Sequence, residues 1–284
     1  MARQRGVAGR AEQLLGRPVA ATAPVASGGI CTTTKLRLAQ GQTALIKTHS
    51  DPPPGFFEAE ARGLRWLGEG NPELLAKVMA VAADALIVEW AEPARPTVEV
   101  AGNFGRLLAQ MHLQGAPTYG AASDGFIGTL PLPNSPTQTW SEFYVTRRVL
   151  PYLKLAHDRG RISPTDVGAV EQLIRRLDQV AGPPEPVARI HGDLWSGNVV
   201  WTLDRVVLID PAAHGGHRET DLAMLALFGV PHLSHITAAY QEVSPLADGW
   251  EERVGLHQLH PLLVHAALFG GEYGARAGRA AAAL

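Results

Sequence analysis

The sequence is poor in cysteine, because Cys31 is the only one among 284 residues. A single cysteine excludes a disulfide within the chain and is typical of proteins that fold in a reducing compartment. Residues 1–10 are basic, but no apolar segment follows them, so they do not predict a secretory signal. We therefore expect a cytoplasmic protein.

Long hydrophobic runs and an excess of one charge are also absent. No apolar run reaches the roughly 18 residues that would predict a membrane span. The net charge is −2, which gives no basic surface for nucleic acid or for an anionic membrane. We therefore expect neither nucleic acid nor a membrane as a partner, and nothing in the sequence indicates an oligomeric state.

Lysine is scarce as well: Arg and Lys together number 25, and the lysines are Lys35, Lys47, Lys77 and Lys154 alone. A lysine inside an apolar strand is therefore less easily explained as incidental. Lys47 occupies such a position, in the segment 44–48, from which it can reach the phosphates of a nucleotide. The alternative is a solvent-facing strand residue.

The order of the predicted elements indicates an α+β fold. Residues 19–48 alternate as strands, with a turn at Gln40-Gly41, and two further strands are predicted near 75–81 and 85–90. Helices are predicted at 11–17, 57–67 and 98–113, and the chain is mostly helical afterwards, with loops at 115–138 and 182–186. We predict a small β-rich lobe, residues 1–90, and a larger helical lobe, residues 91–284.

The most informative segment is His191-Gly192-Asp193-Leu194-Trp195-Ser196-Gly197-Asn198, which precedes an apolar run ending at Asp210. Kinases of the protein-kinase type need an aspartate as base, an asparagine five residues later, and a second aspartate downstream. We assign the base to Asp193 and the magnesium ligands to Asn198 and Asp210. The alternative is a surface turn, since these residue types form turns readily.

Other parts of an ATP site lie upstream in the required order. The turn Ser27-Gly28-Gly29 offers the backbone amides of Gly28 and Gly29 to phosphates. Glu60, on the helix after the Lys47 strand, is the predicted ion-pair partner of that lysine. Glu58 is the competing partner.

Four further residues have open interpretations. Backbone groups of Glu89 and Ala91 can bind an adenine edge, or these residues belong to an edge strand that runs into a linker. Cys31 is either a buried, inert thiol or a redox-sensitive one. Trp195 either stacks on the acceptor substrate or covers its own loop.

The residues after Asp210 include several polar groups with different expected roles. His217 and Arg218 are candidates for substrate or loop contacts. The His, Glu and Asp residues at 214–221 match no common zinc spacing. We expect Asp221 to brace a loop or a helix end, and His191 to brace the catalytic loop by hydrogen bonds.

The chain as a whole resembles the fructosamine kinase (ketosamine 3-kinase) family, within the larger group of aminoglycoside phosphotransferases and choline kinases. The larger group is indicated by Lys47, the helix that carries Glu60, the 191–198 loop and Asp210. Four ordered stretches indicate the narrower family: 191–198; 209–212 with 216–224; 126–148 with its Phe126-Ile127-Gly128, Trp140-Ser141-Glu142-Phe143 and Arg147-Arg148; and 245–253 with 268–273.

The resemblance implies a two-lobed, protein-kinase-like fold and an ATP- and Mg²⁺-dependent kinase. Its substrates would be ketosamines, such as fructosamine or ribulosamine adducts, phosphorylated on the 3-hydroxyl. They would be small molecules or glycated protein lysines, and the reaction would serve deglycation. The alternatives are the same chemistry on an aminoglycoside, choline or homoserine, and a nucleotide-binding pseudoenzyme.

Overall fold

The computed structural model describes residues 6–25 and 30–284. Its N-terminal part is a five-stranded antiparallel sheet with the order β1-β2-β3-β5-β4. The sequence predicts β2 and β3 with the bounds observed, because alternating apolar residues and the turn at Gln40-Gly41 define them. The elements of this part are α1 (Val7–Leu15), β1 (Val19–Val25), β2 (Thr32–Leu38), β3 (Thr43–Thr48), α2 (Phe56–Leu67), η1 (Pro72–Leu74), β4 (Val78–Ala82) and β5 (Ala85–Glu89).

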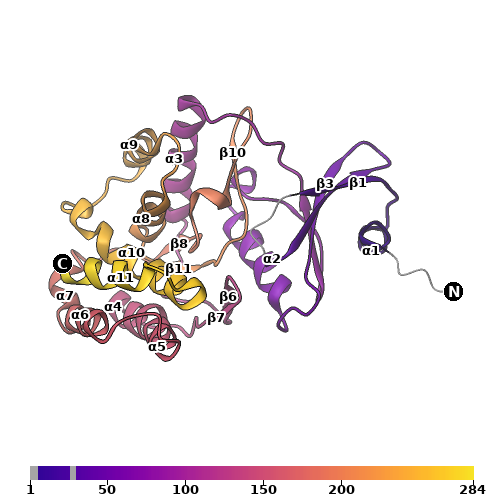
Figure 1. Cartoon of the computed structure of the whole chain (residues 1–284). Helices are drawn as coiled ribbons and strands as arrows, with labels where there is room; N and C mark the ends of the chain where they lie inside the picture. Colours follow the sequence, from indigo (N-terminus) through magenta and orange to yellow (C-terminus); the bar gives the residue numbers. More distant parts are fainter. Residues whose placement is uncertain (1–5, 26–29) are drawn as a thin grey trace.

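Helices α1 and α2 cover opposite faces of this sheet (Figure 1). Successive side chains of a strand point to opposite faces, so Ile87 of β5 packs in the cluster around Ala11 of α1. Its neighbour Leu86 packs in the cluster around Phe57 of α2. The same alternation in β3 directs Lys47 toward α2. The strand period therefore decides that this lysine faces the interior of the molecule.

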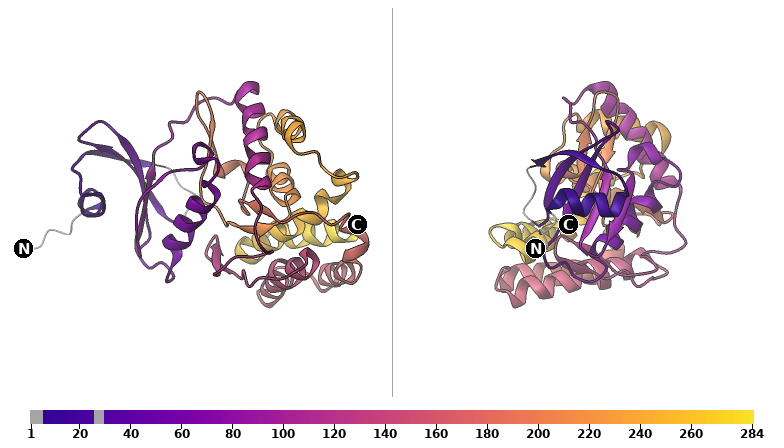
Figure 2. Two further views of the ribbon diagram at one scale, coloured as in Figure 1. Left: turned by 180° about the vertical axis from the view of Figure 1, so that it is seen from behind. Right: turned by 90° about the vertical axis from the view of Figure 1, so that its right-hand side faces the viewer.

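The C-terminal part is mainly helical. Helix α3 packs along α9, and α10 packs against α5, α8 and α11 (Figure 2). Helix α3 begins where predicted, because the Thr97 side chain accepts a hydrogen bond from the backbone N–H of Val100. The helices are α3 (Val98–Leu113), α4 (Trp140–Phe143), η2 (Tyr144–Val149), α5 (Leu150–Asp158), α6 (Pro164–Arg175), α7 (Leu177–Val180), α8 (Glu219–Phe228), α9 (Leu233–Val243), α10 (Trp250–Phe269) and α11 (Tyr273–Ala282).

Short two-stranded sheets flank the 191–198 loop and Asp210. Strand β8 leads into the 191–198 loop, which contains η3, and β10 leads to Asp210. The stretch 115–138, predicted as a loop, contains the hairpin β6–β7, so that prediction was wrong for residues 125–132. The pairs are β6 (Gly125–Ile127) with β7 (Leu130–Leu132), β8 (Ala188–Ile190) with β11 (His214–Gly216), and β9 (Val199–Trp201) with β10 (Val206–Leu208); η3 is Ser196–Asn198.

The α+β class predicted from the sequence is confirmed. Strand β5 ends at Glu89 and α3 begins at Val98, and we keep residues 1–90 and 91–284 as the proposed division. The two parts also touch away from the linker, where the Ala76 N–H donates to the Leu208 carbonyl at 2.9 Å. Within the described residues no helix has both the length and the apolar character needed to span a bilayer.

Candidate active site

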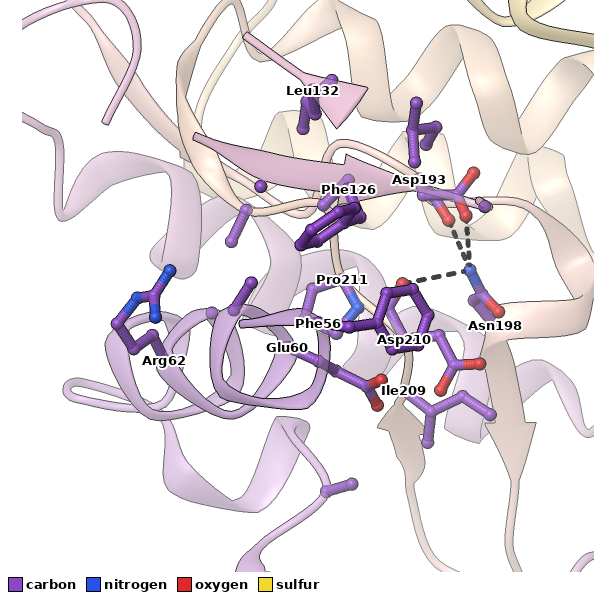
Figure 3. A pocket seen from close by; sticks show the side chains of 18 of the residues that line it. Phe56, Glu60, Arg62, Phe126, Leu132, Asp193, Asn198, Ile209, Asp210 and Pro211 are labelled. Atoms are coloured by element: carbon purple, nitrogen blue, oxygen red, sulfur yellow. Dashed lines mark hydrogen bonds between the residues drawn. The ribbon is translucent and has the colours of Figure 1, made fainter. Parts of the chain in front are cut away.

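A cavity of about 1260 Å³ lies between the two parts and brings most of the predicted site residues together. Its walls come from the sheet, from α2, from the β6–β7 hairpin, from the 191–198 loop and from α10. Figure 3 shows the side chains of Glu60, Asp193, Asn198 and Asp210 in this cavity, which segments far apart in the sequence bring together. The polar groups predicted for the site therefore converge on one cavity.

Lys47 links the two parts of the molecule. Its Nζ atom donates to both carboxylate oxygens of Glu60, at 2.8 and 2.7 Å, and to Asp210 Oδ1 at 2.8 Å. Lys47 is only 7% exposed, so its charge is held inside the cavity wall. The predicted pair with Glu60 is present, and the competing Glu58 is not a partner of Lys47 among the contacts of the described residues.

The charges in the cavity are strongly coupled. Burial disfavours the charged form of Lys47, but Glu60 and Asp210 outweigh burial and raise its pKa. Burial raises the pKa of Glu60, and the Lys47 ammonium opposes that shift. Burial and the negative charge of Asp210 raise the pKa of Asp193 to about 7. Glu60 and Asp210 thus share one ammonium group, and Asp193 lies close enough to Asp210 to be repelled by it. A further cation would relieve this repulsion.

The 191–198 loop places its groups by a tight backbone turn. Gly192 has a φ of 79°, and a Cβ atom there would lie 2.4 Å from the Ala212 carbonyl oxygen, so only glycine fits. The side-chain N–H groups of Asn198 donate to the backbone carbonyl of Asp193 at 2.8 Å and to its Oδ2 at 3.2 Å. In this orientation the side-chain nitrogen of Asn198 bonds Asp193, and its side-chain oxygen is available to coordinate a cation.

The donor set fits a divalent cation such as Mg²⁺. The side-chain oxygens of Asn198 and Asp210 are hard ligands of the kind that this ion prefers, and the surplus of carboxylates described above favours a cation. Asp210 has a φ of 56°, in the left-handed region that non-glycine residues rarely adopt. A residue held in this conformation at a site is a frequent sign of function.

Buried groups brace the loop from behind. Asp221, which is fully buried, accepts hydrogen bonds from the backbone N–H groups of His191 and Gly192 at 2.7 and 2.9 Å. The His191 ring nitrogen Nε2 bonds the Ile209 carbonyl at 2.9 Å. Burial lowers the pKa of His191, so the neutral ring donates this bond. The structure therefore bears out the bracing roles expected for Asp221 and His191.

Trp195 lies between the cavity and its own loop. It lines the cavity and is 39% exposed, so one side of the ring is available to a substrate. A Cβ atom on Gly197 would lie 2.2 Å from this ring, so the ring also covers its own loop. The ring contacts Phe228 edge to face, with centroids 6.1 Å apart.

The structure describes two of the four other residues predicted to bind a nucleotide. Glu89 and Ala91 line the cavity at the end of β5. Gly28 and Gly29 lie outside the described residues. Cys31 lines the cavity, and burial raises the pKa of its thiol, which disfavours the reactive thiolate.

The structure does not bring His217 and Arg218 to the cavity, which corrects the expectation of a substrate contact. His217 is 3% exposed and its ring packs against Trp140 and His257. The Arg218 guanidinium donates to both oxygens of Glu185, at 2.5 and 2.6 Å. Both side chains therefore stabilise the helical part, and tertiary partners that no local pattern indicates decide their place.

One group of described residues, His217, Glu219 and His257, is close enough together to hold a metal ion. Arg253, however, donates to both oxygens of Glu219 at 2.9 and 2.6 Å. This guanidinium already balances the carboxylate and would repel a second cation. We interpret the group as a buried ion pair with packed imidazole rings.

Apart from Trp195, the sequence did not indicate which aromatic residues line the cavity. Phe56 and Phe126 line it beside Glu60, and Phe228 and His265 line it beside Trp195. Periodicity assigns such residues to helix or strand interiors and gives no signal that they face a cavity.

Comparison with known proteins agrees with the geometry. The model of the fructosamine kinase family matches residues 6–284. The chain belongs to the fructosamine kinase family. A probable ketoamine kinase of Enterococcus faecium is 33% identical over 260 residues, which are 89% of this chain and 91% of that protein. One from Thermus thermophilus is 36% identical, over 81% and 82% of the two chains.

Solved structures place this family member within the protein-kinase-like fold. A crystal structure from Thermobifida fusca, provisionally described as a fructosamine-3-kinase, is 50% identical, with a TM-score of 0.93 over 98% of both chains. An aminoglycoside phosphotransferase is 15% identical with a TM-score of 0.61, over 97% of both chains. The latter likeness shows the fold alone, and the protein-kinase-like fold predicted from the sequence is confirmed.

Proposed function

We propose that the protein is an ATP-dependent kinase that phosphorylates the 3-hydroxyl group of ketosamines. The observation that carries this proposal is the convergence of Lys47, Glu60 and Asp210 with Asp193 and Asn198 on one cavity. Membership in the fructosamine kinase family and the likeness to ketoamine kinases support the choice of acceptor. The reaction would serve deglycation, and the cytoplasmic location expected from the single cysteine stays a prediction.

The chemistry assigns one task to each residue. The acceptor hydroxyl oxygen attacks the γ-phosphorus of ATP, the bond from that phosphorus to the ADP oxygen breaks, and the hydroxyl proton passes to the Asp193 carboxylate. A pKa near 7 suits Asp193 to accept this proton at neutral pH. Lys47, held by Glu60, would bind the phosphates, so alignment and charge neutralisation supply most of the catalysis.

Asn198 and Asp210 would hold Mg²⁺, which neutralises charge on the phosphates when it is bound. Nucleotide use is supported by the fold neighbour amicoumacin kinase, whose structure is a complex with AMP-PNP and Ca²⁺. Glu89 and Ala91 are the proposed adenine contacts, and the backbone amides of Gly28 and Gly29 the proposed phosphate contacts. His217 and Arg218 are not retained as substrate contacts.

The acceptor would lie against the aromatic wall beside Asp193. Trp195, Phe228 and His265 line this side of the cavity, and their ring centroids follow one another at 6.1 and 4.9 Å. Such a wall suits the faces of a sugar and an apolar amine substituent. The amine would belong to a small molecule or to a glycated protein lysine.

The test is the consumption of ATP with Mg²⁺ in the presence of ribulosamine and fructosamine adducts of lysine, kanamycin, or choline. Turnover of the ketoamines alone is the expected result. Turnover of kanamycin or choline alone would retain phosphoryl transfer and overturn the acceptor. No turnover of any acceptor, with tight binding of MgATP, would instead favour a nucleotide-binding pseudoenzyme.

A further inference from the structure

The face of α2 that carries Glu60 is held on both sides of this residue. Phe56 lies four residues before Glu60 and Gly63 lies three residues after it, so all three share one helix face. Phe56 and Gly63 both contact segments of the C-terminal part. The position of Glu60 relative to Asp210 therefore depends on contacts outside the sheet.

The first contact is aromatic. The rings of Phe56 and Phe126 have centroids 5.3 Å apart and an interplanar angle of 59°, and Figure 3 shows both side chains at the cavity. Phe126 belongs to β6, the first strand of the hairpin, and β6 packs on α2. On the same helix, Arg62 donates to the Ser123 hydroxyl at 3.1 Å.

The hairpin that carries Phe126 is firmly anchored to the helical part. Arg148, which is 2% exposed, donates to the Pro133 carbonyl and to Asn134 Oδ1, both at 2.6 Å. The Asn134 N–H donates to Asp124 Oδ1 at 2.7 Å, just before β6 begins. Because buried hydrogen bonds to a charged guanidinium are strong, the hairpin can act as a fixed support.

The second contact is a close approach at a glycine. A Cβ atom on Gly63 would lie 3.1 Å from Ala213 Cβ and 3.3 Å from Pro211 Cγ. Pro211 directly follows Asp210, the carboxylate that shares Lys47 with Glu60. Helix α2 therefore lies directly against the segment that places Asp210.

We propose that the β6–β7 hairpin is a clamp that keeps α2 in the position where Glu60 holds Lys47, and that Phe126 is the positioning residue of this clamp. The inference rests on the proposed function, because it assigns Lys47 to the phosphates of ATP. Phe126 acts through Phe56 and α2, and the two anchors flanking Glu60 keep the lysine site assembled before nucleotide binds.

The test is a double-mutant cycle of Phe126→Ala with Glu60→Gln, read on kcat/KM for MgATP. Phe126→Ala is expected to lower this quantity roughly tenfold in the natural chain. In the Glu60→Gln background, Phe126→Ala should lower kcat/KM for MgATP by no more than roughly twofold, because the Lys47–Glu60 pair that Phe126 positions is already broken. Phe126→Leu should restore most of the activity, because it keeps an apolar contact with Phe56.

Equal losses in both backgrounds would overturn the proposal, and so would an effect confined to KM for the acceptor, which would make Phe126 an acceptor contact. If the natural chain turns over no acceptor, the proposed function fails separately. The same cycle is then read on the dissociation constant for MgATP, which requires no acceptor, and equal effects in both backgrounds would again overturn the clamp.

A matched pair of glycine substitutions tests the second anchor. Gly63→Ala is expected to lower kcat/KM for MgATP without lowering the melting temperature. Gly168→Ala, in helix α6 where a Cβ atom meets nothing within 4 Å, should change neither activity nor MgATP affinity. Activity and MgATP affinity of Gly63→Ala equal to those of the natural chain would contradict the clamp.

Discussion

At the scale of single residues, Asp193 is the group on which the proposed reaction depends most. Asp193→Asn keeps the shape of the side chain and the loop but removes the acceptor of the hydroxyl proton. We expect kcat to fall by roughly 10²- to 10⁴-fold, with the dissociation constant for MgATP largely unchanged. Steady-state rates and calorimetric titration with MgATP measure the two quantities.

The matched control for this substitution is Asp204→Asn. Asp204 is exposed and accepts hydrogen bonds from the Thr202 hydroxyl and from Arg205. It lies outside the cavity lining, so the same chemical change should leave kcat unaltered. An Asp193→Asn protein that keeps its kcat but no longer binds MgATP would show that this carboxylate serves the nucleotide and is not the base.

Trp195 allows a test of the acceptor wall. Trp195→Ala is expected to raise KM for the ketoamine roughly 2- to 10-fold, as the loss of an aromatic contact would, while KM for MgATP stays the same. Trp195→Phe should retain most of the affinity. Unchanged KM for the ketoamine together with a lower melting temperature would instead mean that the ring only covers Gly197.

At the scale of elements, α8 supports the 191–198 loop through Asp221. Asp221→Asn places an N–H group where the backbone N–H groups of His191 and Gly192 need an acceptor. It also weakens the bond that the His112 Nε2–H donates to this carboxylate at 3.1 Å. We expect a loss of about 3 kcal/mol in the free energy of unfolding, or roughly 6–12 °C in melting temperature.

Calorimetry and steady-state kinetics check this prediction, because kcat should fall with stability when the loop loses its support. Asp178→Asn is the control: Asp178 bonds the Ser141 hydroxyl in an exposed position, so its loss should shift the melting temperature very little. Natural stability and kcat in Asp221→Asn would mean that the loop is held by other contacts.

Elements with a strong local period could be predicted from the sequence, and those made by tertiary contacts could not. The apolar stripe of α2 and the alternation in β2 and β3 predict those elements with bounds within a residue. The hairpin β6–β7 has three residues per strand, too few for a period, and it forms on α2 and on the anchored 133–134 segment. Asp193 and Asn198 could be proposed for the site because their spacing is a local feature, and Lys47 because it lies in an apolar strand, and all three line the cavity. The partners of His217 and Arg218, in contrast, come from distant segments.

At the scale of the whole molecule, buried imidazole rings make the free energy of unfolding depend on pH. Six histidines are buried: His112, His191, His214, His217, His257 and His260. Burial is the main cause that lowers the pKa of His191, His214 and His217, and it lowers that of His260 to about 3. These four rings stay neutral in the folded protein over a pH range in which the unfolded chain takes up protons.

The sign of the effect on stability follows from this difference. Below the unfolded pKa of about 6.5, the unfolded state binds more protons at these histidines, so stability falls as pH falls. Each such ring contributes up to about 1.4 kcal/mol per pH unit. Glu60 and Asp193 act in the opposite direction, because their pKa values are raised to about 7 and the folded state holds more protons there.

Four histidines outweigh these two carboxyl groups, so we expect the free energy of unfolding to fall by about 2–3 kcal/mol per pH unit between roughly pH 6 and 4.5. Urea denaturation at pH 7.0, 6.0 and 5.0 measures the slope. His260→Asn retains a donor for the Arg148 carbonyl, which the ring bonds at 3.0 Å. This substitution removes one group that takes up a proton on unfolding, so the slope should decrease by up to about 1.4 kcal/mol per pH unit. His157→Asn, at an exposed position of α5, should leave the slope unchanged. A slope that is flat or opposite in sign would show that the two carboxyl groups, and not the buried rings, govern the response of this fold to acid.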